Sequence, residues 1–177
     1  MSFALYAGVF AEKNYSVSLT MPTVGEWYMF TVTFDGMNNA DSLKMYLNDT
    51  YDSTPVKNTD QDASGLSPVN MRGNIGANGN NGGGFNADHR IYSLATWDSV
   101  LSAAEITAIY NGKDPKEVDL LVSSGDYASS ASLKNWWLPG REVSPNLGKD
   151  FGPQGIDMTN ESSITDADII IGDIPEP

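Results

Sequence analysis

The chain has 177 residues, no cysteine and a formal net charge of −13 at pH 7. Disulfide frameworks, zinc–thiolate sites and cysteine nucleophiles are therefore excluded. We expect no nucleic-acid partner, because nucleic-acid binding needs a basic surface. We also expect no membrane insertion, because no apolar run approaches the roughly 20 residues that a membrane-spanning helix requires. The 17 glycines favour short strands joined by turns over long helices.

The first half of the chain predicts a succession of short strands. Apolar and polar residues alternate at 15–20 and again at 27–34, which is the period-two pattern of a half-buried strand. In the second segment, Phe30 and Val32 share the more apolar face, and Met29 lies on the other. Further strands are expected at 3–10, 42–47, 54–57, 69–76 and within 85–97.

One short helix is expected at 103–110. Ser102 is a suitable N-cap residue, and Glu105 three positions later completes a capping box. Leu101 and Ile106 are spaced to form the accompanying hydrophobic staple. An Asn-Gly pair after the last turn ends the helix.

The composition changes after residue 116, where apolar stretches alternate with segments rich in Ser, Pro and Gly. We therefore predict two parts: a β-sandwich domain at 1–118, and a C-terminal extension at 119–177 that packs on the sandwich or completes it. Strand-like segments of the extension are found at 118–122, 133–138 and 155–160, and an apolar tail at 166–177.

Four patterns in chain order resemble the laminin-G and pentraxin family. A glycine, a tryptophan, an alternating strand and an Asp-Gly turn occupy 25–36, and a second strand ending in Asn follows at 42–48. An Ile-Gly strand stands at 74–76, and Leu-Ser-x-x-Glu-Ile at 101–106 precedes Tyr-Asn-Gly at 110–112. The resemblance implies an all-β fold, a concanavalin A-like (laminin-G-like) jelly-roll β-sandwich with one short helix.

This family usually has two opening strands before the segment that corresponds to Phe3. Without these two strands a sheet edge would stay open, and an open edge invites pairing with other chains. We therefore expect residues 155–160 and 169–174, or a neighbouring chain, to fill those positions in the sheets.

The C-terminal segments at 133–138, 157–160 and 173–175 are similar to extensions of such domains in virion proteins of marine bacteriophages. This resemblance implies a non-enzymatic structural or adhesion protein of the virion, attached to the capsid or tail. Its partners would be other virion proteins, further copies of the chain (a trimer is the expectation) and cell-surface glycans. The alternative is a secreted carbohydrate-binding module or lectin.

Catalytic patterns are weak in this sequence. Sandwich-fold glycosidases need two carboxylates across the sugar cleft, and no alternating run of carboxylates occurs on a predicted strand. Glu26 borders a strand and Glu105 belongs to the helix cap. His89 is the only histidine, and a hydrogen bond to a neighbouring carboxylate explains it better than a catalytic triad does. We therefore expect that the protein is not an enzyme.

Two oxygen-rich loops and one aromatic pair are the candidate sites. Calcium takes oxygen ligands, and a loop with Asp35, Asn38 and Asp41 offers them, although turn chemistry alone explains the same residues. Of Trp136 and Trp137, at most one is expected to be exposed, because adjacent strand residues point to opposite faces. The predicted ligand-binding residues are Asn78, Asn80, Asn81, Asp88 and Trp136.

Overall fold

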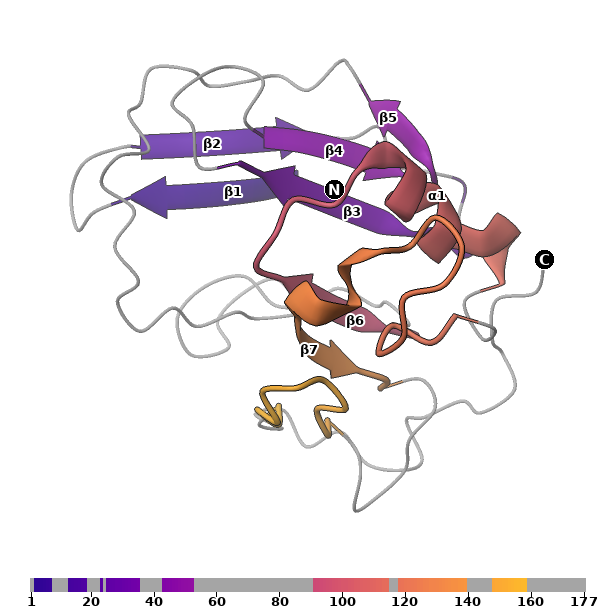
Figure 1. Ribbon diagram of the computed structural model, residues 1–177. Coiled ribbons are helices and arrows are strands. Elements are labelled where there is room, and N and C mark those ends of the chain that lie inside the picture. Colours follow the sequence, from indigo (N-terminus) through magenta and orange to yellow (C-terminus); the bar gives the residue numbers. More distant parts are fainter. Residues whose placement is uncertain are drawn as a thin grey trace.

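The computed structural model describes residues 2–7, 13–18, 23, 25–35, 43–52, 91–114, 118–139 and 148–158, with backbone alone for 2–7, 13–18, 43, 52 and 113. In these residues all strand pairing is antiparallel, and a short helix, α1, lies beside the strands (Figure 1). The all-β expectation with one short helix is therefore confirmed. The strands expected at 54–57 and 69–76 lie outside the described residues.

The first strands form a hairpin. β1 (Ser2–Ala7) pairs with β2 (Lys13–Ser18) over their full length, from Ser2 opposite Ser18 to Ala7 opposite Lys13. β2 begins two residues before the expected segment at 15–20.

A second sheet has the order β3-β4-β5, formed by β3 (Phe30–Phe34), β4 (Leu43–Leu47) and β5 (Thr50–Asp52). The ladder is shorter than the strand expected at 27–34, but the pairing continues past it. Asn48 donates its backbone N–H to the Met29 carbonyl at 2.7 Å, and the Met29 N–H donates to Asn48 Oδ1 at 3.1 Å.

The β4 strand is buried on both faces. Met45 is 0% exposed and its neighbour Tyr46 is 6% exposed, and adjacent strand residues point to opposite sides. Tyr46 belongs to the main core cluster, and Met29 packs against that cluster. The register places Thr31 opposite Tyr46, so the main core lies on the threonine-bearing face of β3. The more apolar face of β3 lies on the other side, with Met45.

A third sheet pairs strands that are distant in the sequence. β6 (Leu94–Trp97) is antiparallel to β7 (Leu133–Trp137), which comes from the predicted C-terminal extension. A bulge leaves Lys134 unpaired, because Thr96 faces Asn135 and Trp97 faces Leu133. The extra residue allows Leu133 and Trp136 to reach the same core although they are three positions apart.

The helix forms as its sequence predicts. α1 spans Ala103–Tyr110, Ser102 Oγ accepts the Glu105 N–H at 3.2 Å, and Glu105 Oε2 accepts the Ser102 N–H at 2.8 Å, so the capping box is confirmed. Leu101 and Ile106 are both buried in the core. Asn111, at φ 45°, ends the helix in the left-handed region.

One core joins β4, β6, α1 and β7. The division into parts at 118 and 119 stays a prediction, since residues from both sides contribute to it. No helix among the described residues is long and apolar enough to cross a bilayer. The core cluster consists of Tyr46, Leu101, Ile106, Leu120, Tyr127, Leu133, Trp136 and Leu138.

Two segments of the extension differ from the strands that the sequence predicts. At 118–122 the chain turns, because Asp119 Oδ1 accepts the Leu121 N–H at 2.9 Å. At 155–158 the backbone is irregular, so these four residues do not supply a strand to a sheet. The other residues expected to do so, 159–160 and 169–174, lie outside the described residues.

Candidate functional site

Most of the predicted loop ligands lie in parts of the chain that the structure does not describe. Asp35 is exposed at the end of β3. No group of three or more His, Cys, Asp or Glu side chains that could hold a metal ion occurs among the described residues. Calcium therefore stays a prediction. The residues outside the described ranges are Asn38, Asp41, Asn78, Asn80, Asn81 and Asp88.

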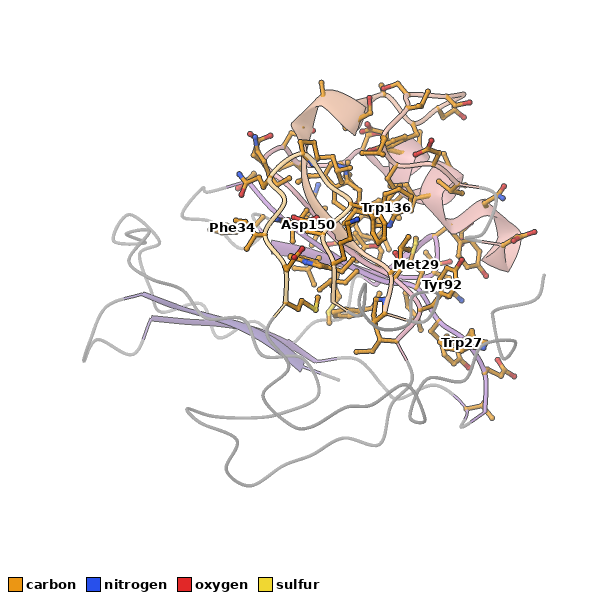
Figure 2. The ribbon with its side chains drawn as sticks, turned by 90° about the horizontal axis from the view of Figure 1, so that it is seen from below. Trp27, Met29, Phe34, Tyr92, Trp136 and Asp150 are labelled. Carbon is orange, nitrogen blue, oxygen red and sulfur yellow. The ribbon has the colours of Figure 1, made fainter. Side chains whose placement is uncertain are left out.

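The tryptophan pair divides between the core and the surface. Trp136 is 8% exposed, belongs to the core cluster and donates its Nε1–H to Ser93 Oγ at 3.1 Å (Figure 2). Its ring therefore has no open face for a sugar, which corrects the assignment of Trp136 as a ligand-binding residue. Trp137 points to the opposite face and is half-buried.

Residues 148–158, which we call the strap, run along β7 on the edge away from β6. The Phe151 N–H donates to the Trp136 carbonyl at 2.7 Å, and the Gln154 N–H donates to the Lys134 carbonyl at 3.0 Å. Asp150 forms an isolated antiparallel bridge with Trp137. The strap therefore covers an edge of the kind that, when open, invites pairing with another chain.

Asp150 is the centre of the strap, and its side chain is only 6% exposed (Figure 2). Its Oδ1 accepts hydrogen bonds from the backbone N–H groups of Trp136 (2.7 Å) and Gly152 (2.8 Å). Its Oδ2 accepts from Asn135 Nδ2 (2.6 Å) and from the Ile156 N–H (2.8 Å). Burial alone would raise the pKa of this carboxyl, but the four donors together lower it below the usual value.

The backbone of the strap lies directly on β7 at Gly152. A Cβ atom at this position would lie 2.7 Å from both the Asn135 Cα and the Trp136 nitrogen, closer than such atoms approach. Asn135 is itself buried, and its Oδ1 accepts from Thr96 Oγ1 at 3.0 Å. A continuous polar chain thus links β6, β7 and the strap from Thr96 through Asn135 to Asp150.

Glu105 is the second buried carboxylate, at 7% exposure. Besides its bonds to Ser102, its Oε1 accepts the Ala128 N–H at 3.3 Å, which joins the helix start to the loop before the 3-10 turn Ser129–Ser132. Burial would raise the pKa of Glu105, but hydrogen bonds from Ser129, Ser102 and Ala128 lower it below the usual value.

Tyr127 makes a third buried polar connection. Its hydroxyl accepts the Trp97 Nε1–H at 3.0 Å and donates to the Leu120 carbonyl at 3.0 Å. The side chain is 3% exposed, and burial is the main cause that raises the pKa of its hydroxyl. The bond to Trp97 connects the end of β6 to the loop before β7.

These contacts define the role of the two buried carboxylates. A glycosidase acid is a carboxyl whose pKa is raised, so that it keeps its proton near neutral pH. The pKa values of Asp150 and Glu105 are both lowered. Both side chains therefore act as ionised acceptors that stabilise the fold.

The strap also supports a small surface beside β7. Trp137 donates its Nε1–H to the Ile156 carbonyl at 2.8 Å, and the Ile156 side chain is 56% exposed. The next residue, Asp157, is exposed, and its Oδ1 accepts the Asp150 N–H at 2.9 Å. Sequence reasoning missed Ile156 and Asp157. Alternation singled out the tryptophan pair, but it carried no sign of which ring faces the core.

The comparisons with known proteins give the family. A family model described as the concanavalin A-like lectin/glucanases superfamily matches residues 1–107, which include β1 to β6 and the first five residues of α1. β7 and the strap lie beyond the match. The comparisons with curated proteins and with solved structures found no match. The antiparallel strands and the short helix α1 of the described residues agree with a concanavalin A-like β-sandwich. The match spans more than half of the chain, which therefore belongs to the concanavalin A-like lectin/glucanases superfamily.

Proposed function

We propose that this protein is a non-catalytic adhesion domain that binds carbohydrate. Membership of a superfamily of lectins and glucanases supports carbohydrate as the ligand class. The net charge of −13 favours neutral ligands over anionic ones, because it repels negative charge.

The non-catalytic part of this proposal rests on one observation: the two buried carboxylates, Asp150 and Glu105, are occupied by hydrogen bonds within the fold. Asp150 accepts four hydrogen bonds, and Glu105 is shared between the helix cap and the Ala128 N–H. Both have lowered pKa values, whereas an acid catalyst of glycoside hydrolysis needs a raised one.

The second part of the proposal concerns where the protein acts. We place the domain on a bacteriophage particle, at the capsid or tail, in contact with other virion proteins and as a homo-oligomer such as a trimer. The resemblance of 133–138 and 157–160 to extensions in phage virion proteins supports this placement. A secreted lectin is the competing setting. Mass spectrometry of purified particles distinguishes them, because a virion protein is present in fixed stoichiometry and a secreted lectin is absent.

A paired assay tests the activity. The purified chain is screened on a glycan array, and each bound glycan is then incubated with the protein and analysed for released sugar. We expect saturable binding without released product. Release of product by the wild-type chain would contradict the non-catalytic part, and the absence of binding to any glycan would contradict the carbohydrate part.

Calcium dependence is tested on the same array. If the loop with Asp35, Asn38 and Asp41 holds a calcium ion that the binding needs, a chelator abolishes binding and added calcium restores it. Binding that is unchanged by the chelator would leave these residues with turn chemistry alone.

A further inference from the structure

We propose that Trp137, Ile156 and Asp157 form a glycan subsite outside the family-matched part of the chain, with Trp137 as the ring on which one neutral sugar stacks. The inference rests on the proposed carbohydrate-binding function and locates one binding site for it. All three residues lie beyond residue 107, where the family match ends. The subsite is therefore a property of the C-terminal part of this chain.

The Trp137 ring is held in one orientation before any ligand arrives. The residue follows the buried Trp136 on β7, so it points away from the main core. Its indole N–H is bonded to the Ile156 carbonyl at 2.8 Å, which fixes the ring against the strap. A side chain that is already ordered loses less conformational entropy on binding, and this favours affinity.

Ile156 and Asp157, the other two residues of the subsite, are held by hydrogen bonds with Asp150. The Ile156 N–H donates to Asp150 Oδ2 at 2.8 Å, and the Asp150 N–H donates to Asp157 Oδ1 at 2.9 Å. Asp150 also bridges to Trp137. Asp150 thus anchors Ile156 through its N–H and Asp157 through its carboxylate, next to the strand that carries Trp137.

These three side chains match the chemistry of a neutral sugar. A pyranose ring has an apolar C–H face, which an indole and a neighbouring aliphatic side chain cover, and a rim of hydroxyl groups. A carboxylate accepts hydrogen bonds at both oxygens, and Asp157, which uses Oδ1 for the Asp150 N–H, has further acceptor positions for hydroxyl donors. The same carboxylate, on a chain with a net charge of −13, repels sialic and uronic acids.

The size of the surface favours a sugar over a protein. A stable protein interface buries about 800 Å² on each partner. An aromatic side chain contributes at most about 250 Å², and Trp137 is half-buried. Among the residues that the structure describes, Trp137, Ile156 and Asp157 by themselves do not supply that area, but they suffice for one or two sugar rings.

The test compares variants of the full chain on an array of neutral glycans, followed by calorimetry with the glycan that binds best. We expect Trp137→Ala to weaken binding at least tenfold, and Trp137→Phe, which keeps a ring, to weaken it less. Asp157→Asn, which removes the charge, is expected to weaken binding several-fold. Tyr51→Ala is the matched control, because Tyr51 is an aromatic residue on β5 with 41% exposure, and its loss is expected to leave affinity unchanged.

Tryptophan fluorescence distinguishes direct stacking on Trp137 from a purely structural role of this residue. Stacking of a sugar on Trp137 changes the emission of the wild-type chain, and this change is expected to disappear in Trp137→Phe while that variant still binds. Thermal melting confirms that each variant is folded. If Trp137→Ala does not fold, Trp137→Phe and Asp157→Asn decide the matter.

The outcomes separate the subsite from the proposed function. If the wild-type chain binds a glycan and the folded Trp137 and Asp157 variants bind it equally well, the subsite is overturned and the proposed function stands. If the wild-type chain binds no glycan, both fail. If Trp137→Ala changes the solution mass by light scattering but not the glycan affinity, the surface joins copies of the chain, and the subsite is overturned.

Discussion

The carboxylate of Asp150 takes the place of a neighbouring strand for Trp136: it accepts the Trp136 backbone N–H at 2.7 Å, while the next residue, Phe151, donates its own N–H to the Trp136 carbonyl at 2.7 Å. One residue of β7 thus has both backbone groups satisfied by two consecutive residues of the strap. This arrangement replaces an open sheet edge with a closed one, and it does so with a charged group, which makes strong hydrogen bonds to N–H donors.

Removal of this carboxylate is therefore expected to be costly. Asp150→Ala leaves three backbone N–H groups and the Asn135 amide without their acceptor in a buried site. Each buried donor left unpaired costs about 1–3 kcal/mol. Because water takes the place of the carboxylate for some of these donors, we expect a loss of about 3 kcal/mol or more in the free energy of unfolding. Urea denaturation measures it. Asp126→Ala, at an exposed loop position, is the control and should change stability little.

The same site predicts how stability depends on pH. The folded-state pKa values of Asp150 and Glu105 lie below their usual values, so the unfolded chain binds protons more readily than the folded one. Their contribution is fully present above the unfolded pKa values, about 3.9 for Asp and 4.3 for Glu. It is lost as the pH falls through the lower folded values.

Thermal melting between about pH 6 and pH 2 checks this sign, because the carboxyl groups titrate in that window. The melting temperature should fall as the solution becomes acidic. A variant that lacks the Asp150 carboxyl, Asp150→Asn, should start from a lower stability and lose less of it in acid. An equal acid dependence in this variant and the wild-type chain would contradict the role given to Asp150.

The local parts of the fold were predictable from the sequence, and the long-range parts were not. The capping box of Ser102 and Glu105 depends on residues three positions apart, and it forms as expected. The identity of the buried tryptophan depends on the bulge at Lys134, which changes which residues of β7 share a face. A bulge arises from the pairing with β6, some 40 residues earlier, and leaves no local pattern.

The strap was missed for the same reason. A Gly-Lys-Asp-Phe-Gly-Pro sequence is typical of a turn, and nothing near it shows that Asp150 meets the backbone of Trp136. Alternation also identified the two faces of β3 correctly. It did not show that the main core lies on the face with Met29, because that depends on where β7 and α1 pack.

The close contact at Gly152 gives a prediction about strap docking. In Gly152→Ala the new methyl group meets the backbone of Asn135 and Trp136 at 2.7 Å, and backbone atoms cannot move aside cheaply. We expect a loss of about 1–3 kcal/mol, as for other overpacked sites. Gly155→Ala is the comparison, since Gly155 has φ +61° but open space around it, and its cost of about 1–2 kcal/mol comes from the backbone conformation alone.

Hydrogen exchange distinguishes these two glycine variants. The N–H groups of Phe151 and Gln154 bond to β7, so they should exchange faster in Gly152→Ala if the strap is displaced. In Gly155→Ala the same two groups should keep more of their protection. Equal protection in the two variants would show that the strap tolerates the methyl group and that the contact at Gly152 is relieved by a small shift.

The hydroxyl of Tyr127 carries the last prediction. Tyr127→Phe keeps the buried ring but removes the acceptor for Trp97 Nε1 and the donor for the Leu120 carbonyl. Because both partners lose a bond at a site that is 3% exposed, we expect a loss of about 1–3 kcal/mol, measured by urea denaturation. Tyr51→Phe, at a residue 41% exposed, should cost much less, since water satisfies its hydroxyl in either state. Equal losses in the two variants would show that the Trp97 indole and the Leu120 carbonyl find other partners, and that the connection between β6 and the loop before β7 does not depend on this hydroxyl.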